Sequence, residues 1–244
     1  MSKKRLDARL AELFPQYSRT QLQGWVLQGK VLVHGHPETK AGTMVSDDVH
    51  IELLAVPPQY VSRGGLKLER ALEFFKIDVN DLVALDAGIS TGGFTDCLLQ
   101  HGVRKVYGID VGYGQVHEKL RTDPRVSIIE RTNFRQYVHE GEPIDLITLD
   151  LSFISLLKVV PTIWNLLRPG GQLITLVKPQ FEVGKGLVPS GGVLKDTVVR
   201  DEAVKRVVEG IQEAGFSCSG VIQSPITGAD GNVEFLAHFV KKEN

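Results

Sequence analysis

Three glycines follow a carboxylate within a few residues in the stretch LDAGISTGGFTD, which spans residues 85–96. Gly88, Gly92 and Gly93 all follow Asp86 closely. Because glycine has no side chain, a backbone rich in it can approach a ligand closely. The stretch therefore predicts a binding loop whose ligand tolerates a neighbouring negative charge.

Three classes of ligand compete for this loop. A phosphate-binding P-loop needs a lysine after its last glycine, and none follows Gly92 or Gly93. The glycine spacing does not fit a dinucleotide fingerprint, and Asp86 would repel a pyrophosphate. S-adenosylmethionine remains, because it has a cationic end for Asp86 and a nucleoside beyond it.

A second acid supports S-adenosylmethionine as the cofactor. The segment KVYGID ends at Asp110, 24 residues after Asp86, where a carboxylate can accept hydrogen bonds from both ribose hydroxyls. The alternative is that Asp110 only caps the next helix. Asn133 and Phe134 could face the adenine or form an ordinary turn. The predicted cofactor site comprises Asp86, Gly88, Ser90, Thr91, Gly92, Gly93, Phe94, Asp110, Val111, Asn133, Phe134 and Asp150.

The residues at the ends of the apolar segments DLITLDL and QLITLV constrain the identity of the methyl acceptor. Amino-group methyltransferases commonly carry Asp/Asn-Pro-Pro-Tyr/Phe there, whereas this chain reads DLSF from Asp150 to Phe153. Carbon methylation through a thiolate would need a cysteine at a strand end, and Cys97 and Cys218 lie elsewhere. Lys178 follows the fifth segment, and it can meet Asp150 if the two strands are neighbours. A lysine beside a methyl donor suggests proton removal from a weakly acidic hydroxyl.

A lysine base needs help, because a free lysine has a pKa near ~10.4 and is mostly protonated at neutral pH. Partial burial and a second cation lower such a pKa. Lys67 could be this cation, and Glu234 opens the final strand. If that strand is antiparallel, its start lies at the edge where the parallel strands end. The alternative is that Lys67 and Glu234 are solvated surface charges.

The segments that must position these residues alternate between strand and helix. The predicted strands are LVALD, KVYGID, VSIIER, DLITLDL and QLITLV, and the predicted helices are residues 66–76, 94–102, 152–168 and 198–215. This alternation predicts an α/β, Rossmann-like fold with a mostly parallel sheet covered on both faces. The last two strands flank the short loop TGADGN, so one of them is expected to be antiparallel.

A separate α+β unit precedes this sheet. Residues 5–14 read as an amphipathic helix, and Ser18 could cap a second helix that stops at Gly29. Strands follow in KVLVHGHP and MVSDDVHIEL, and the prolines at 57–58 mark the end of the unit. We therefore expect domains at 1–57 and 63–244, joined by a linker at 58–62.

Composition and charge narrow the class of protein. The chain has 244 residues and a net charge of −1. Its residues are 42% hydrophobic and 23% charged, which is typical of globular proteins. Residues 1–46 carry seven Lys or Arg against three Asp or Glu, which suits an acidic partner. The cysteines have no zinc or disulfide spacing, so we expect reduced thiols and no metal. Without a signal peptide or an uninterrupted membrane span, we expect a cytoplasmic protein without membrane contact.

Seven stretches carry a resemblance to a known family: YVSRGGLKL, LDAGISTGGFTD, DVGYGQ, RTNFR, DLSFISL, VKPQFEVGKG and GNVEF. Through them the chain resembles the TlyA, or hemolysin A, family of ribosomal RNA 2′-O-ribose methyltransferases. Its second part is similar to the FtsJ class, whose Lys-Asp-Lys-Glu tetrad falls here on Lys67, Asp150, Lys178 and Glu234. The resemblance implies that Lys178 is the catalytic base.

The first 55 residues resemble an S4 RNA-binding domain through RLDARLAEL and SRTQLQGWVLQGKVLVHG, with His34-Gly35 where many S4 domains have Asn-Gly. The resemblance implies ribosomal RNA as the partner and no obligate protein partner. Such RNA is read by shape and 2′-hydroxyls, with the target nucleotide turned outward. The expected RNA contacts are Arg5, Arg9, Arg19, Lys30, Arg63 and Lys185. Alternatively, these residues only solvate the surface.

The S4 pattern starts early in the chain, and the chain ends soon after its last predicted strand. In this it resembles the family's shorter members, which modify only large-subunit RNA. We therefore expect a cytidine of 23S RNA as the target. Two other functions stay open, namely a membrane-lysing toxin, as the family name records, and a non-catalytic ribosome-assembly factor. The glycine-rich loop 180–196 could close over RNA or be a passive connector.

Overall fold

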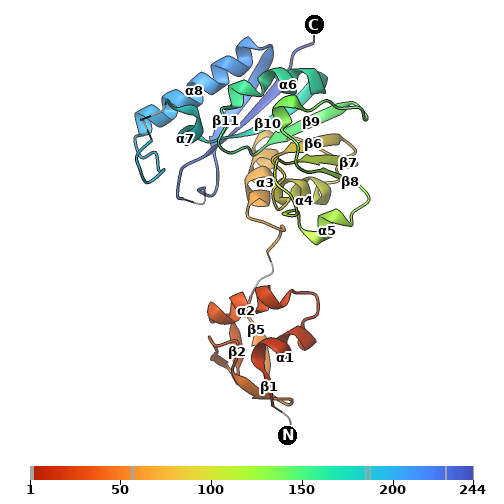
Figure 1. The fold of residues 1–244 in the computed structure, drawn as a ribbon, viewed down its shortest axis with the longest axis vertical. Helices are drawn as coiled ribbons and strands as arrows, with labels where there is room; N and C mark the ends of the chain where they lie inside the picture. The colour runs from red at the N-terminus through yellow and green to blue at the C-terminus, as the bar shows by residue number, and fades with distance from the viewer. Residues whose placement is uncertain (1–2, 56–57, 185, 187, 229, 244) are drawn as a thin grey trace. The chain divides into compact units, whose positions relative to one another are not determined.

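A computed structural model describes residues 3–55, 58–184, 186, 188–228 and 230–243. The chain divides into two compact units, Met1–Pro57 and Pro58–Asn244 (Figure 1). Each unit has its own hydrophobic core, so each is described by itself below.

The N-terminal unit packs two helices against short antiparallel strands. Its strands are β1 (Lys3–Arg5), β2 (Val31–Val33), β3 (His36–Pro37), β4 (Met44–Ser46) and β5 (Ile51–Leu53), and its helices are α1 (Leu6–Leu13) and α2 (Arg19–Leu27). Strand β1 pairs with β4, and β2 pairs with both β3 and β5. Ser18 caps α2 in a reciprocal arrangement with Gln21, as the sequence predicts. His34 and Gly35 both have positive φ angles, which a two-residue hairpin turn between β2 and β3 requires.

The second unit is built on a seven-stranded sheet. Its strands are β6 (Val83–Ala87), β7 (Lys105–Ile109), β8 (Val126–Ile129), β9 (Ile144–Leu149), β10 (Leu167–Val177), β11 (Phe216–Gln223) and β12 (Phe235–Lys241). They lie in the order β11-β12-β10-β9-β6-β7-β8. Strand β12 is antiparallel to both of its neighbours, and the other pairings are parallel. The predicted α/β fold with one antiparallel strand is therefore confirmed.

Helices cover both faces of this sheet (Figure 1). One face packs against α3 (Gly64–Phe75), α4 (Gly93–Gln100) and α5 (Glu118–Arg121). The other face packs against α6 (Val160–Leu166), α8 (Thr197–Glu213) and two short 3₁₀ helices, η1 (Phe134–Gln136) and η2 (Leu156–Lys158). The short helix α7 (Pro179–Glu182) follows β10. Loops at the carboxyl ends of the parallel strands remain free to form a site.

The chain between β9 and β10 differs from the single helix predicted over residues 152–168. Residues 151–155 form a loop, η2 and α6 follow, and β10 already begins at Leu167. Pro161 lies in the first turn of α6, where its missing N–H is tolerated. Phe153 adopts a φ of 64°, which interrupts any helix. The carboxyl end of β9 is therefore followed by an exposed loop instead of a helix.

No helix in the described part of the chain combines the length and apolar character needed to cross a bilayer.

Candidate active site

The glycine-rich loop joins β6 to α4 under tight packing. Gly88 has a φ of 86°, and a Cβ on it would lie 2.5 Å from the Asp150 carbonyl oxygen. Gly92 has a φ of 99° and caps α4. A Cβ on Gly93 would lie 2.2 Å from the Ser62 Oγ. The glycines therefore bring the loop close to the end of β9 and to the segment before α3, in addition to exposing backbone to a ligand.

Asp86 is fully buried and is not among the residues that line the two cavities described below. Its carboxylate accepts hydrogen bonds from the Thr95 Oγ1 at 2.7 Å and the Thr148 Oγ1 at 3.0 Å. Burial raises the pKa of Asp86 to about 6. The sequence places Asp86 beside the cationic end of the ligand. In the structure, by contrast, its side chain turns inward and ties β6 to α4 and β9.

Asp110 follows β7 and faces a cavity of about 450 Å³. Its two carboxylate oxygens accept hydrogen bonds from the Ser90 N–H at 2.8 Å and the Gly112 N–H at 2.7 Å. These backbone bonds fix the carboxylate at the rim of the glycine-rich loop. Other lining residues are Gly88, Val111, Gln115, Asn133, Phe134, Asp150, Leu151 and Phe153.

This cavity fits a nucleoside by its chemistry. A half-buried carboxylate with unused lone pairs suits a ribose diol. Phe134 and Leu151 provide apolar surface for a base. Asn133 accepts a hydrogen bond from the Arg135 N–H through its Oδ1, so its amide nitrogen remains available as a donor. Most of the predicted cofactor residues therefore lie around one volume.

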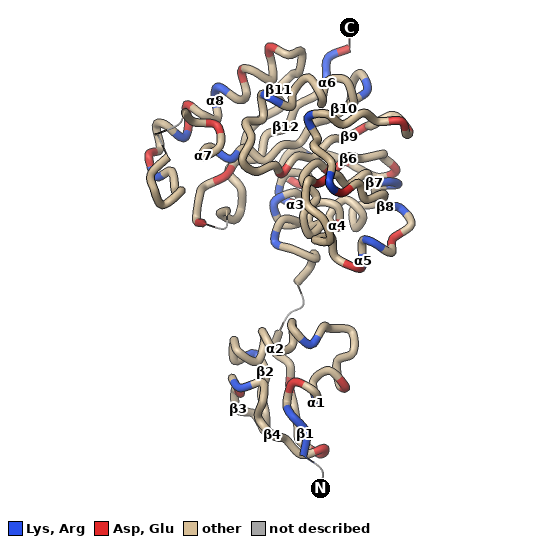
Figure 2. Tube along the Cα trace, in the orientation of Figure 1, with Lys and Arg blue, Asp and Glu red and all other residues tan. Residues whose placement is uncertain are grey.

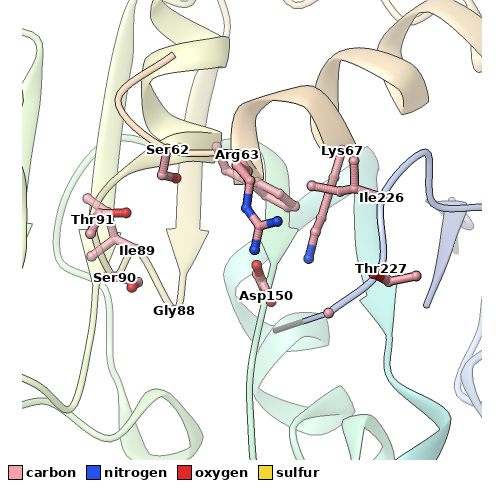
Figure 3. Close-up of a pocket in the computed structure, with 14 residues that line it drawn as sticks. Ser62, Arg63, Lys67, Gly88, Ile89, Ser90, Thr91, Asp150, Ile226 and Thr227 are labelled. Atoms are coloured by element: carbon pink, nitrogen blue, oxygen red, sulfur yellow. The ribbon is translucent and has the colours of Figure 1, made fainter. Parts of the chain in front are cut away.

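A second cavity, of about 210 Å³, adjoins the same loop. It shares Gly88, Ser90 and Asp150 with the first cavity. The remaining lining residues are Ser62, Arg63, Gly64, Lys67, Ile89, Thr91, Gly93, Phe94, Ile226, Thr227 and Gly228. In Figure 3, the side chains of Arg63 and Lys67 both point toward Asp150. The two cavities thus meet at Asp150.

Two ion pairs stand at this edge of the sheet. The Lys178 Nζ lies 2.6 Å from the Asp150 Oδ1, and it donates a hydrogen bond to the Ser152 Oγ at 3.0 Å. The Lys67 Nζ donates to the Glu234 Oε2 at 2.6 Å. The Lys67 and Glu234 side chains are only 9% and 3% exposed, and those of Lys178 and Asp150 are 11% and 25% exposed. Burial makes both pairs strong electrostatic contacts compared with surface ion pairs.

The topology explains why these four residues gather. Asp150 and Lys178 directly follow β9 and β10, which are parallel neighbours. Glu234 directly precedes β12, which is antiparallel, so its start lies at the same edge. Lys67 comes from the first turns of α3, which packs against β12.

Glu182 ties together the segments that follow β9 and β10. It lies at the end of α7, is 9% exposed, and accepts a hydrogen bond from the Leu156 N–H at 2.8 Å. Burial raises the pKa of this carboxyl group. The rings of Phe153 and Phe181 lie 5.0 Å apart between the same segments. These contacts hold the loop after Asp150 against the helix after Lys178.

Sequence reasoning missed several residues that line the two cavities. Ser62 stands in the quoted stretch YVSRGGLKL, but the sequence offers no reason to choose its hydroxyl over the neighbouring residues. Ile226, Thr227 and Gly228 belong to the segment before Glu234, which the sequence suggests only as a connection between two strands. Phe153 stands in the quoted stretch DLSF, but the sequence does not show that its ring is exposed.

The basic residues expected to contact RNA differ in their surroundings. Arg5 and Arg19 both bind the carboxylate of Asp7. Arg9 bonds with Glu12 and with the backbone oxygen of Asp47. Lys30 is exposed, Arg63 lines the smaller cavity, and Lys185 lies outside the described residues.

Two family models match the chain. Residues 60–241 match the FtsJ-like methyltransferase model, and residues 4–51 match the S4 domain model. Together they account for both compact units.

Named relatives match over most of their length. The 16S/23S rRNA (cytidine-2′-O)-methyltransferase TlyA of Mycobacterium tuberculosis is 44% identical over 235 residues, covering 95% of this chain and 88% of that protein. Hemolysin A of Brachyspira hyodysenteriae is 42% identical over 226 residues, covering 91% of this chain and 94% of that protein.

Solved structures agree with the sequence matches. A Streptococcus thermophilus structure, provisionally named a hemolysin, is 38% identical, has a TM-score of 0.73, and covers 100% of this chain and 90% of that chain. The N-methyltransferase NodS of Bradyrhizobium japonicum, solved with S-adenosyl-L-homocysteine, has a TM-score of 0.53 at 18% identity and covers 73% of this chain and 88% of that chain, so it shares the fold alone. The chain therefore belongs to the TlyA, or hemolysin A, family and is an FtsJ-like methyltransferase with an S4 domain at residues 4–51.

Proposed function

We propose that this protein transfers a methyl group from S-adenosylmethionine to the ribose 2′-hydroxyl of a cytidine in 23S ribosomal RNA. The observation that carries the proposal is the gathering of two ion pairs beside the cavities at the carboxyl edge of the sheet, the buried pair Lys67–Glu234 and the partly buried pair Lys178–Asp150. The name of a Campylobacter jejuni relative, 23S rRNA (cytidine-2′-O)-methyltransferase TlyA, supports the choice of RNA and nucleotide; it is 37% identical over 203 residues, covering 81% of this chain and 77% of that protein.

The cofactor would occupy the two adjoining cavities. Asp110 would accept hydrogen bonds from the ribose, and Asn133 and Phe134 would contact the adenine. The backbone of the loop from Gly88 to Gly93, together with Ser62, would hold the amino acid end. When bound, S-adenosylmethionine supplies an electrophilic methyl group on a sulfonium. Asp86 would act indirectly, because its bonds to Thr95 and Thr148 fix the loop's starting point.

Lys178 would be the base in this reaction. Its amine must be neutral to accept the proton of the 2′-hydroxyl, and the resulting ammonium would then be stabilised by Asp150, 2.6 Å away. Ser152 would hold the same amine in place. Lys67 and Glu234 would complete the electrostatic surroundings of the attacking oxygen. The enzyme's further contribution is to align that oxygen with the methyl carbon and the sulfur.

A nucleotide turned out of its helix would suit the surface next to this group. Phe153 is 90% exposed on the loop after Asp150, and a base can stack on such a ring. Arg63 points toward Asp150 in Figure 3 and can contact the RNA backbone there. The N-terminal unit, residues 1–57, would bind RNA through Arg5, Arg9, Arg19 and Lys30. The second compact unit begins at Pro58, so residues 58–62 would lead directly into the catalytic domain, residues 63–244.

The proposal is tested by mapping ribose 2′-O-methyl groups on ribosomal RNA from cells with and without the gene. One cytidine of 23S RNA should lose its methyl group in the deletion strain. A plasmid copy of the wild type should restore it, whereas a Lys178→Ala copy should not. An unchanged map, together with calorimetry showing no binding of S-adenosylmethionine, would overturn the proposal and leave the toxin or assembly-factor function.

A further inference from the structure

We infer that Asp7 is a positioning residue that holds Arg5 and Arg19 as one preformed site for an RNA phosphate. The inference rests on the proposed RNA substrate and deepens it. Asp7 is fully buried, yet it is a charged side chain in a small domain. The side chains that bond to this carboxylate also cover it from solvent, so these partners indicate what it does.

The Asp7 carboxylate accepts hydrogen bonds from the N–H groups of three side chains. The Arg5 Nε and Nη2 donate to its two oxygens, each at 3.1 Å. The Arg19 Nε and Nη2 donate to its Oδ2 at 3.3 and 2.9 Å, and the Gln23 Nε2 donates to the same oxygen at 2.7 Å. One carboxylate therefore fixes two guanidinium groups next to each other.

The fold places these side chains from three different elements. Arg5 ends β1, Asp7 lies in the first turn of α1, and Arg19 is the first residue of α2. Figure 2 shows the basic residues of β1 beside the acidic start of α1. The Asp7 N–H donates to the Ala41 carbonyl oxygen at 3.0 Å, which anchors the carboxylate through its own backbone. The site is therefore formed by the packed domain and not by a mobile terminus.

Both arginines keep donors free for a ligand. A guanidinium has five N–H groups, and only those on Nε and Nη2 face Asp7. The Nη1 group and one Nη2 hydrogen of each arginine remain, and the two side chains are 54% and 56% exposed. Gly42 leaves the face of the Arg5 guanidinium uncovered, since a Cβ there would lie 3.5 Å from the Arg5 Nη1. Two such donors side by side match the two anionic oxygens of a phosphodiester.

The pair carries more positive charge than it loses to Asp7. Two guanidinium groups share one carboxylate, and the hydrogen bond from Arg5 holds the pKa of that carboxyl well below its usual range. The neighbouring Arg9 is less available for a ligand. Arg9 is 22% exposed and uses Nη1 on Glu12 and Nη2 on the Asp47 oxygen. The arginine pair is therefore the better candidate for phosphate binding on this face.

The inference can be tested by whether removing the charge of Asp7 strengthens or weakens RNA binding. Removing a carboxylate should strengthen RNA binding if only net charge matters, because RNA is a polyanion. If Asp7 instead positions the arginines, Asp7→Asn should weaken binding although the protein becomes more positive. Glu52→Gln is the matched control, since it removes an exposed carboxylate of the same unit whose ion-pair partner is His50 and not an arginine.

The experiment measures binding of the full chain to a 23S ribosomal RNA transcript by filter binding at several salt concentrations. We expect Asp7→Asn to raise the dissociation constant about tenfold and to reduce the salt slope by about one phosphate contact. Glu52→Gln should bind as tightly as the wild type or tighter. In methyl transfer, Asp7→Asn should raise the KM for RNA and leave kcat unchanged, which a general loss of folding would not do.

Arg5→Lys and Arg19→Lys provide a second route if Asp7→Asn does not fold. Both variants keep the charge but lose the fork of two nitrogens that Asp7 and a phosphate share. Each should weaken RNA binding about as much as Asp7→Asn. The inference is overturned if the wild type binds RNA and these variants bind equally well. A wild type that does not bind the transcript at all would instead contradict the proposed function.

Discussion

The Lys178 Nζ and the Asp150 Oδ1 lie 2.6 Å apart, although 28 positions separate the two residues in the chain. The contact follows from topology, because each residue directly follows one of two adjacent parallel strands. Ser152 and the Glu182 anchor then fix the loop on either side of the pair. The proposed base and the carboxylate proposed to stabilise it are thus positioned by rigid elements, as a catalytic group requires.

Lys178→Ala should abolish methyl transfer while leaving cofactor binding within a few-fold of the wild type. The reason is that the amine would accept the 2′-hydroxyl proton and makes no contact that the cofactor needs. We expect the single-turnover rate to fall by about 10²- to 10⁴-fold, the usual range for loss of a general base. Rates are measured by methyl incorporation into ribosomal RNA, and affinity is measured by calorimetry with S-adenosylmethionine.

Lys205→Ala is the control for this variant, because Lys205 is a lysine on α8 whose side chain is 74% exposed. It should transfer methyl groups at the wild-type rate. Equal rates for Lys178→Ala and the wild type would rule out Lys178 as the base.

Asp110→Ala should weaken binding of S-adenosylmethionine. The variant loses the proposed bonds to the ribose and also releases the backbone of Ser90 and Gly112. A hydrogen bond to a charged group contributes about 1.5–3 kcal/mol, so we expect affinity to fall about 10- to 100-fold. Calorimetry checks the affinity, and saturating cofactor should recover most of the rate. Asp201→Ala is the control, because it removes an exposed acid of α8, and it should bind S-adenosylmethionine normally. If Asp110→Ala also binds normally, Asp110 does not contact the ribose.

Much of the fold could be predicted from local pattern. The five residues of β6 are all buried, which is why the sequence shows the apolar run LVAL directly before Asp86. The secondary structure of residues 152–168 was harder to predict, because Leu156, Val160 and Ile163 have the spacing of a single helix. The prediction of one helix was wrong there since Pro161, the φ of Phe153 and the bond from Leu156 to Glu182 divide the segment.

The site could be predicted only in part. Residues at strand ends share one edge in a parallel sheet, so the neighbourhood of Asp150 and Lys178 follows from sequence. The burial of Asp86 does not, because its partners Thr95 and Thr148 come from two other elements. Likewise, the sequence suggests Arg5 as a phosphate contact, but only the packing of α1 on α2 reveals its carboxylate partner.

Asp86→Asn should change how stability depends on pH. The folded-state pKa of Asp86 is raised from 3.8 to about 6, so the folded protein holds this proton more tightly than the unfolded chain does. The stability from this group is therefore fully present below about pH 4 and is lost as the pH rises through 6. The free energy of unfolding of the wild type, relative to Asp86→Asn, should fall by up to about 3 kcal/mol between pH 4 and pH 7.5.

Urea unfolding followed by fluorescence measures this difference. The sequence has two tryptophans, so a Trp25→Phe background leaves Trp164 as the reporter of the catalytic unit. Asp123→Asn is a control of opposite sign, because the hydrogen bond from Arg125 lowers the pKa of Asp123. There the wild type should gain stability over the variant as the pH rises. A difference for Asp86→Asn that does not vary with pH would contradict the raised pKa.

Phe153→Ala should weaken RNA binding and methyl transfer without destabilising the protein. The side chain is 90% exposed, and its removal costs one contact with the ring of Phe181, while the bond from the Leu156 N–H to Glu182 still holds the loop. The φ of 64° is also unfavourable for a bulky residue. Stacking of a base on an aromatic ring contributes about 1–3 kcal/mol, so we expect roughly 5- to 100-fold weaker use of RNA. The ratio kcat/KM for RNA measures this loss. Phe153→Trp should retain most of the wild-type kcat/KM. Phe74→Ala removes an exposed phenylalanine of α3, which lines neither cavity, and should leave kcat/KM unchanged. If Phe153→Ala matched that control, the outward-turned base would have to rest on other residues.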